Sequence, residues 1–199
     1  MQLGFVSSKA DQSLFLRFTS TSCIYLLVYV DDIIITRNDS LVISILIFLL
    51  NQKFSLKDLS ILHYFLGVEV QHTENGGMLL SQEKYLTDIL RKAKMVIAEA
   101  FSTAMVGGLR LSAHQGEPIP DPKLYRSIVG ALQYATITRP EISYSVNKVS
   151  QFMHNPLNSH WQAVKLILRY LNGTLHHGLY FSKPSHLSLE GFFLCGLGI

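Results

Sequence analysis

The segment from Ile24 to Thr36, IYLLVYVDDIIIT, most constrains how this chain can fold. Its aromatic, β-branched and aliphatic residues favour a β-strand, apart from the adjacent Asp31 and Asp32. Consecutive strand side chains point to opposite faces, so a straight strand would bury one carboxylate at a cost on the order of several kcal/mol. A hairpin that turns at Asp31 and Asp32 avoids this cost. We therefore predict two antiparallel strands with both carboxylates at one exposed tip.

Two interpretations of this acidic pair remain open from the local pattern. An aspartate-rich β-turn would need no function, although the pair lacks the glycine or asparagine that tight hairpins favour. The alternative is a divalent metal site, because Mg²⁺ takes oxygen ligands and is held by one or two carboxylates together with substrate phosphates. Two such ions about 4 Å apart can activate an attacking hydroxyl and stabilise a leaving phosphate.

The strand and helix patterns predict an α+β fold, in which strands come first and helices last. A strand at 13–18 precedes the acidic segment, and a helix is predicted from about 38 to 53. This helix contains the apolar run LVISILIFLL. It is either buried all round, or without its partners, or drifted in sequence, and a membrane-associated role is a weak further possibility. The run is shorter than the ~20 residues that span a bilayer.

The second half of the chain is predicted to be a hairpin followed by helices. HYFLGVEVQH reads as a strand broken at its glycine, and the following Asn-Gly turn leads back into MLL. Ser81 is predicted to cap the next helix. Further helices are predicted over about 123–137, 141–154 and 159–171.

Charge is unevenly distributed, although the net charge of the 199 residues is only +3. Residues up to 80 include five basic and seven acidic side chains, and the remainder include twelve basic and seven acidic. A basic half fits a polyanionic partner, and ordinary surface scatter is the alternative. Two cysteines exclude a disulfide framework or a cysteine-rich zinc site. The N-terminus lacks the pattern of a signal peptide, so we expect an intracellular protein that is not secreted and has no transmembrane segment.

Several motifs in one order carry a resemblance to a known family. LLVYVDDIIIT is similar to the Y-x-D-D motif of reverse transcriptases, in the form typical of copia-type long-terminal-repeat retrotransposons. FSLKDLSILHYFLGVEV, LLSQEKYLTDILRKAKM and the long block that begins YRSIVGALQYATITRPEISY resemble the segments that follow in that family. The resemblance extends from about Gly4 to Phe181.

The resemblance implies roles for the matched positions in the first half. Asp31 and Asp32 would bind the catalytic metals, Mg²⁺ or Mn²⁺. Val30 would lie near the primer end and the incoming nucleotide, and Tyr29 would support the primer strand. The hairpin that grips the primer terminus would be formed by Phe65, Leu66 and Gly67. Phe65 and Leu66 are almost equally well interpreted as core residues.

The resemblance also implies an RNA template, a DNA primer and deoxynucleotides as partners, and no membrane. The domains would be a partial palm at 1–80, a helical thumb and connection at 81–181, and a divergent tail at 182–199. The basic side chains of the helical region could contact phosphates, although a solvated face is the simpler interpretation of any single one. They are Arg91, Lys92, Lys94, Arg126, Arg139, Lys148, Lys165 and Arg169. The sequence gives no indication of an oligomeric state.

The chain also departs from this family. The family's palm uses a third carboxylate from an earlier strand, and neither that segment nor the fingers is matched. The tail lacks the aspartates that open the family's RNase H domain. We therefore expect the chain alone to be inactive as a polymerase. The alternative to an enzyme fragment is a non-catalytic retrotransposon remnant that at most binds nucleic acid.

Overall fold

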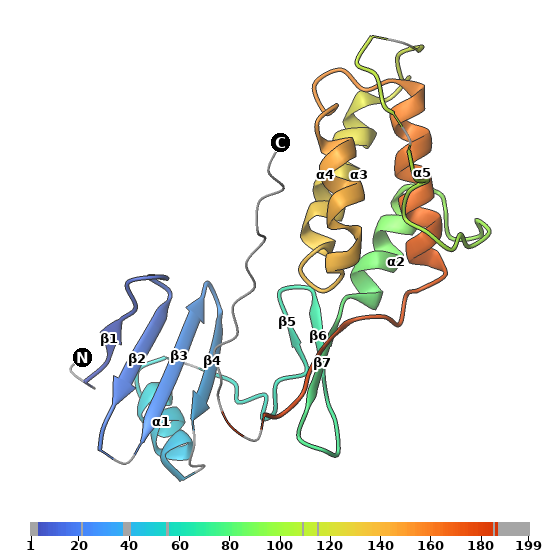
Figure 1. Ribbon diagram of the computed structural model, residues 1–199. Helices are drawn as coiled ribbons and strands as arrows, with labels where there is room; N and C mark the ends of the chain where they lie inside the picture. Colours follow the sequence, from blue (N-terminus) through green and yellow to red (C-terminus); the bar gives the residue numbers. More distant parts are fainter. Residues whose placement is uncertain are drawn as a thin grey trace, which may run out of the picture. The chain divides into compact units, whose positions relative to one another are not determined.

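The computed structural model describes residues 4–20, 22–37, 41–54, 56–108, 110–114, 116–184 and 186. The chain divides into two compact units, Met1–Leu62 and His63–Ile199. Within the described ranges, each unit contains a four-stranded antiparallel sheet and at least one helix (Figure 1). The predicted α+β class is therefore confirmed.

The first unit is a meander of four strands with one helix on it. The strands are β1 (Val6–Ser7), β2 (Leu14–Phe18), β3 (Cys23–Tyr29) and β4 (Asp32–Arg37), and they pair in chain order. Helix α1 (Leu41–Asn51) follows, and its predicted cap at 38–40 lies outside the described residues. The predicted strands at 13–18 and 24–36 are confirmed, and the short β1 was not anticipated.

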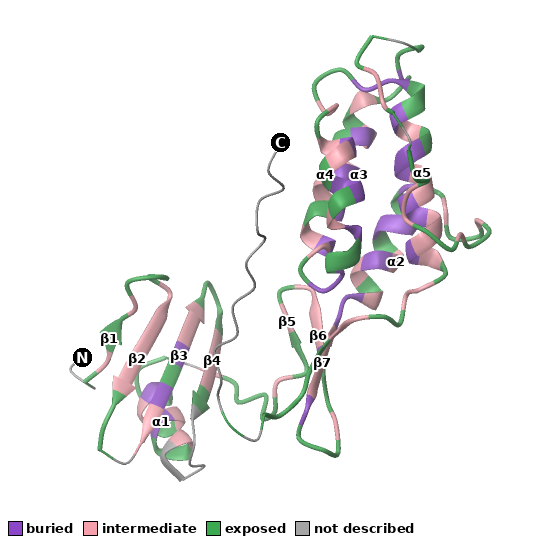
Figure 2. Ribbon diagram, in the orientation of Figure 1, coloured by how far each residue is buried: buried purple, intermediate pink, exposed green. Residues whose placement is uncertain are grey.

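The apolar helix α1 buries only part of its surface. Leu46 and Leu50 pack against Ile24 of β3 and form the small core of this unit. Ile45 and Phe48 on the same helix are exposed (Figure 2). The helix is therefore not buried all round within this unit. No helix in the described part of the chain has both the length and the apolar character needed to cross a bilayer.

The second unit begins with a sheet that joins both of its ends. Strands β5 (Tyr64–Phe65), β6 (Val68–His72) and β7 (Met78–Ser81) form successive hairpins, and β8 (Leu179–Phe181) pairs with β7. Gly178 allows this last pairing, because a Cβ there would lie 2.3 Å from the carbonyl oxygen of Leu80. The sequence patterns gave no sign of β8, because three residues are too few to show a period.

The helices of the second unit enclose the main core. They are α2 (Glu83–Lys92), α3 (Pro122–Ala135), the short 3₁₀ helix η1 (Pro140–Ile142), α4 (Ser143–Ser150) and α5 (Asn158–Asn172). Figure 2 shows their buried faces turned toward one another. Tyr125, Leu132 and Ile167 are among the fully buried residues. The predicted helices are confirmed to within a few residues at their ends.

The start of α2 differs from the prediction that Ser81 caps it. Ser81 belongs to β7, and Gln82 occupies the N-cap position without a capping side-chain bond. Glu69 of β6 supplies the missing acceptor, since its Oε1 accepts the backbone N–H of Lys84 at 2.9 Å. A carboxylate at this position also complements the positive end of the helix dipole. Local sequence could not reveal a cap that comes from another strand.

Helix α2 ends with Lys94 in the left-handed conformation, at a φ of +57°. The backbone N–H groups of Lys94 and Met95 donate to Arg91 and Leu90, which closes a Schellman motif that usually carries glycine. We expect Lys94→Gly to raise the free energy of unfolding by about 0.5–1 kcal/mol in a denaturant titration. Lys92→Gly is the matched control and should lower it by about 1 kcal/mol, because Lys92 is helical. An unchanged Lys94→Gly variant would show that the lysine side chain offsets its backbone strain.

His160 caps the start of α5 from a fully buried position. Its Nδ1 accepts the backbone N–H of Leu157 at 3.0 Å, and its Nε2 lies 2.9 Å from the carbonyl oxygen of Ser112. Both bonds form when the imidazole is neutral and carries its proton on Nε2. Burial lowers the pKa of His160 from its ordinary value of 6.5, and the bond to Ser112 opposes this shift.

The pKa of His160 predicts how stability depends on pH. Because the folded pKa is lower than the unfolded one, the stabilisation is complete above the unfolded pKa and is lost as the pH falls through the folded pKa. We expect the free energy of unfolding to decrease between pH 7.5 and pH 5. His160→Gln should be less stable at pH 7.5 and should show a shallower pH dependence. Equal slopes in urea titrations of the two proteins would assign the effect to other groups.

Candidate functional site

The acidic pair lies at the tip of the β3–β4 hairpin. Tyr29 pairs with Asp32, so the loop consists of two residues, Val30 and Asp31. The hairpin is confirmed, but the predicted turn at Asp31 and Asp32 is wrong by one residue. Asp31 is in the loop and Asp32 begins β4. Both aspartates are exposed, as predicted.

Val30 explains why the turn was misplaced. Its φ is +49°, and its side chain is 82% exposed. Asp31 is not among the residues with positive φ, so positive φ occurs only at the first loop position, as in a type II′ turn. A β-branched residue is strongly disfavoured there, at a cost of about 1–2 kcal/mol, and glycine is the usual choice. Turn rules therefore pass over Val30, and the strain marks the tip as a position under functional demand.

The two carboxylates suit a hard divalent cation. They are adjacent and exposed, and they offer only oxygen ligands. Among the described residues, no group of three histidine, cysteine or acidic side chains is assembled for metal binding. The tip therefore fits the case in which one or two carboxylates share a cation with substrate phosphates. Tyr29, which faces Asp32 across the hairpin, is about half exposed.

A second tight tip joins β5 and β6. Phe65 pairs with Val68, so Leu66 and Gly67 form the loop, with φ of +50° and +83°. Positive φ at both positions is typical of a type I′ turn. The predicted strand with a glycine break is thus a hairpin. Phe65 is half-buried and Leu66 is exposed, so neither is a fully buried core residue.

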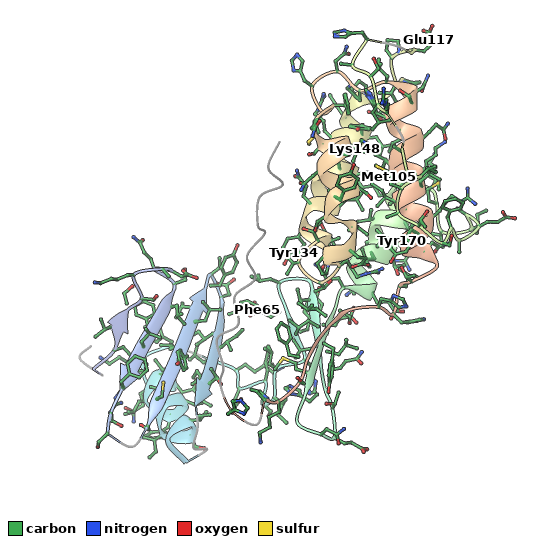
Figure 3. All side chains as sticks on the ribbon, in the orientation of Figure 1. Phe65, Met105, Glu117, Tyr134, Lys148 and Tyr170 are labelled. Atoms are coloured by element: carbon green, nitrogen blue, oxygen red, sulfur yellow. The ribbon has the colours of Figure 1, made fainter. Side chains whose placement is uncertain are left out.

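The second tip is attached to helix α3. The hydroxyl of Tyr134 donates to the carbonyl oxygen of Leu66. A Cβ on Gly67 would lie 3.6 Å from Cε1 of Tyr134, so the ring covers the turn. Figure 3 shows Tyr134 at the end of α3 that faces the hairpin carrying Phe65. The sequence gave no signal for this contact, which joins residues 68 positions apart.

The basic residues on α2 and just after it are exposed. Arg91 pairs with Asp88 at 2.7 Å, and Lys92 donates to the hydroxyl of Ser127. Lys94 is exposed beyond the end of the helix. These side chains can reach a phosphate by giving up weak surface partners, because exposed ion pairs contribute only ~0–1 kcal/mol.

The basic residues on α5 are more engaged with the protein. Lys165 and Arg169 are both half-buried. The Nε of Arg169 donates to the carbonyl oxygen of Glu99 at 2.7 Å, and its guanidinium lies over the ring of Phe101, 5.2 Å from the centroid. A phosphate contact therefore stays a prediction for both residues.

Arg139 does not lie where a phosphate contact was predicted. It is 1% exposed, and its Nε donates to Glu141 at 2.7 Å. Its two terminal nitrogens donate to the backbone and side-chain oxygens of Thr174, at 2.8 and 2.6 Å. The prediction is wrong for Arg139, because burial and three partners exclude the guanidinium from a ligand. It joins η1 to the end of α5 instead.

Comparison with known proteins gives the class of this chain. Residues 1–107 match the family model described as reverse transcriptase (RNA-dependent DNA polymerase). The match includes both hairpin tips and the acidic pair. The chain therefore belongs to the reverse transcriptase family, in agreement with the motifs in its sequence.

Individual relatives narrow the class to the copia type of retrotransposon. The chain is 45% identical over 96% of its length to the retrovirus-related Pol polyprotein from transposon RE2 of Arabidopsis thaliana, and 46% identical over the same share to that from transposon RE1. It spans 13% of the length of each. An uncharacterized mitochondrial protein of the same plant is 46% identical over 84% of this chain and 69% of its own length. No solved structure matches the chain at a significant level.

Proposed function

We propose that this chain is the part of a retrotransposon reverse transcriptase that carries the metal-binding hairpin of the palm, followed by the thumb and connection. One observation carries the proposal: two adjacent carboxylates stand exposed at a two-residue hairpin tip, within a segment that belongs to this family. The short length relative to the transposon polyproteins supports a role as one portion of a larger polymerase.

In this proposal Asp31 and Asp32 hold Mg²⁺, with Mn²⁺ as a substitute. Bound metal would lower the barrier to attack by the primer hydroxyl on the nucleotide and would stabilise the leaving pyrophosphate. The hairpin backbone places the two carboxylates, and the exposed Val30 lies between them and Tyr29 in the chain. We assign Val30 to the neighbourhood of the incoming nucleotide and Tyr29 to the support of the primer strand.

The remaining assignments follow the same comparison. Phe65, Leu66 and Gly67 would grip the primer terminus, and the basic helical region would follow the phosphates of an RNA–DNA hybrid. The proposed functional domains remain 1–80 and 81–181, although the compact units divide at 62 and 63. The β5–β6 hairpin thus shares a unit with the helices. The proposed tail from 182 lies mostly outside the described residues.

Transplanting the chain into a complete polymerase tests the proposal. The matching segment of the RE1 transposon polyprotein, which is 46% identical, would be replaced by this chain. The chimera should extend a DNA primer on an RNA template with Mg²⁺, whereas this chain alone should give no extension. An inactive chimera that folds and binds the hybrid would reject the polymerase assignment.

A non-catalytic remnant that binds nucleic acid is the second candidate. The exposed basic residues Arg91, Lys92 and Lys94 favour it, because they require no third carboxylate. Binding of an RNA–DNA hybrid to the chain should weaken steeply with added salt, as phosphate contacts release counterions. Replacing these three residues by alanine should reduce the slope by up to about three charges' worth. No measurable binding at low salt would remove this candidate.

A further inference from the structure

We infer that Tyr134 is a positioning residue for the Leu66–Gly67 tip and that it thereby sets where this tip meets the primer strand. The inference rests on the proposed function, since it assumes that the β5–β6 hairpin grips the primer. It adds a residue from α3, which lies outside the segment that the family model matches.

The conformation of the tip is the first step of this argument. Both Leu66 and Gly67 have positive φ, and a type I′ turn of this kind favours asparagine or glycine at its first position. Leucine occupies it, and its side chain is 39% exposed. The sequence therefore keeps an apolar side chain outward at a position where turn chemistry disfavours it. Val30 does the same at the metal hairpin, and such strained residues cluster at functional sites.

The attachment of the tip is the second step. Pairing between Phe65 and Val68 fixes the turn within the hairpin, but it leaves the hairpin free to shift as a body. The hydroxyl of Tyr134 binds the Leu66 carbonyl at the apex, and its ring lies against Gly67. This bond to the apex therefore ties the tip to the end of α3 (Figure 3).

Tyr134 is itself held in place by the helices. Its ring meets that of Tyr85 edge to face, with centroids 5.3 Å apart and an interplanar angle of 78°. The hydroxyl of Tyr85 donates to the carbonyl oxygen of Ala131 on α3 at 3.2 Å. The two tyrosines thus make the same kind of bond from the same cluster, and only Tyr134 touches the tip. Tyr85→Phe is therefore a matched control for Tyr134→Phe.

Photocrosslinking of the full chain tests the inference directly. An RNA–DNA hybrid with a photoreactive base at the primer 3′ end is bound at low salt, and the cross-link to residues 64–68 is measured per bound hybrid by mass spectrometry. We expect the wild-type chain to cross-link at the tip. Tyr134→Phe should reduce the yield at least threefold with affinity unchanged within about twofold, and Tyr85→Phe should leave the yield unchanged.

The chimeric polymerase supplies a readout that stability alone would not move. Tyr134→Phe should raise KM for the primer–template about three- to tenfold, while kcat and KM for the nucleotide stay within twofold. Equal behaviour of the two variants, or no cross-link to the tip in the wild-type chain, would overturn the inference. The polymerase assignment is judged separately, because it depends on extension by the wild-type chimera. Cross-linking at the tip with an inactive chimera would keep the positioning role and reject the catalytic one.

Discussion

Replacing Asp31 or Asp32 by asparagine in the chimeric polymerase is expected to lower kcat by about 100-fold or more. Asparagine keeps the size of the side chain but removes the negative charge that holds a divalent cation. Metal stabilisation of the charge that develops during phosphoryl transfer contributes several kcal/mol, and each 1.36 kcal/mol corresponds to about tenfold in rate. Single-turnover primer extension at saturating hybrid and nucleotide measures this loss at the chemical step.

The structure supplies a control with the same chemical change. Asp88 is exposed on α2 and pairs only with Arg91, three residues further on. Asp88→Asn should keep kcat within twofold, because a surface pair of this kind contributes little to stability. The Mn²⁺ affinity of each variant separates loss of metal from loss of folding. Retention of full activity by either hairpin variant would show that the tip is not the metal site.

The hairpin itself could be predicted from sequence because burial of a carboxylate is costly. Two acids inside an apolar strand leave few alternatives to an exposed turn, and this argument needs no knowledge of distant residues. Its register was missed by one residue because Val30 occupies the left-handed position at the first loop residue. A propensity rule assigns such a position to glycine or asparagine and never to valine. The error and the strain therefore have the same origin.

The contacts that organise the second unit were out of reach for a different reason. Glu69 caps α2 from a strand, and Tyr134 holds Leu66 across 68 residues. Helix periodicity finds the elements that bring such partners together, but it does not specify which side chains then meet. Arg139 illustrates the consequence. Its charge suggested a phosphate contact, and only the fold reveals that it is a buried structural residue.

Arg139→Ala is expected to destabilise the second unit by about 3 kcal/mol. The substitution removes three hydrogen bonds from a charged donor and leaves the oxygens of Thr174 without this partner. It also empties the volume of a long side chain that is 1% exposed. At roughly 2–4 °C per kcal/mol for a chain of this size, Tm should fall by about 6–12 °C when the helices are followed by circular dichroism.

Two further variants separate the contributions at Arg139. Arg126 is exposed and makes one long bond, 3.4 Å, to the backbone oxygen of Met153, so Arg126→Ala should cost no more than about 0.5 kcal/mol. Glu141→Gln keeps the volume but leaves the buried guanidinium without its carboxylate. Because a buried charge without its partner is costly, it should destabilise more than a surface Glu→Gln change. If Arg139→Ala and Arg126→Ala had equal effects, the buried arginine would not be the link between η1 and α5. The helical unit would then depend on its apolar core alone.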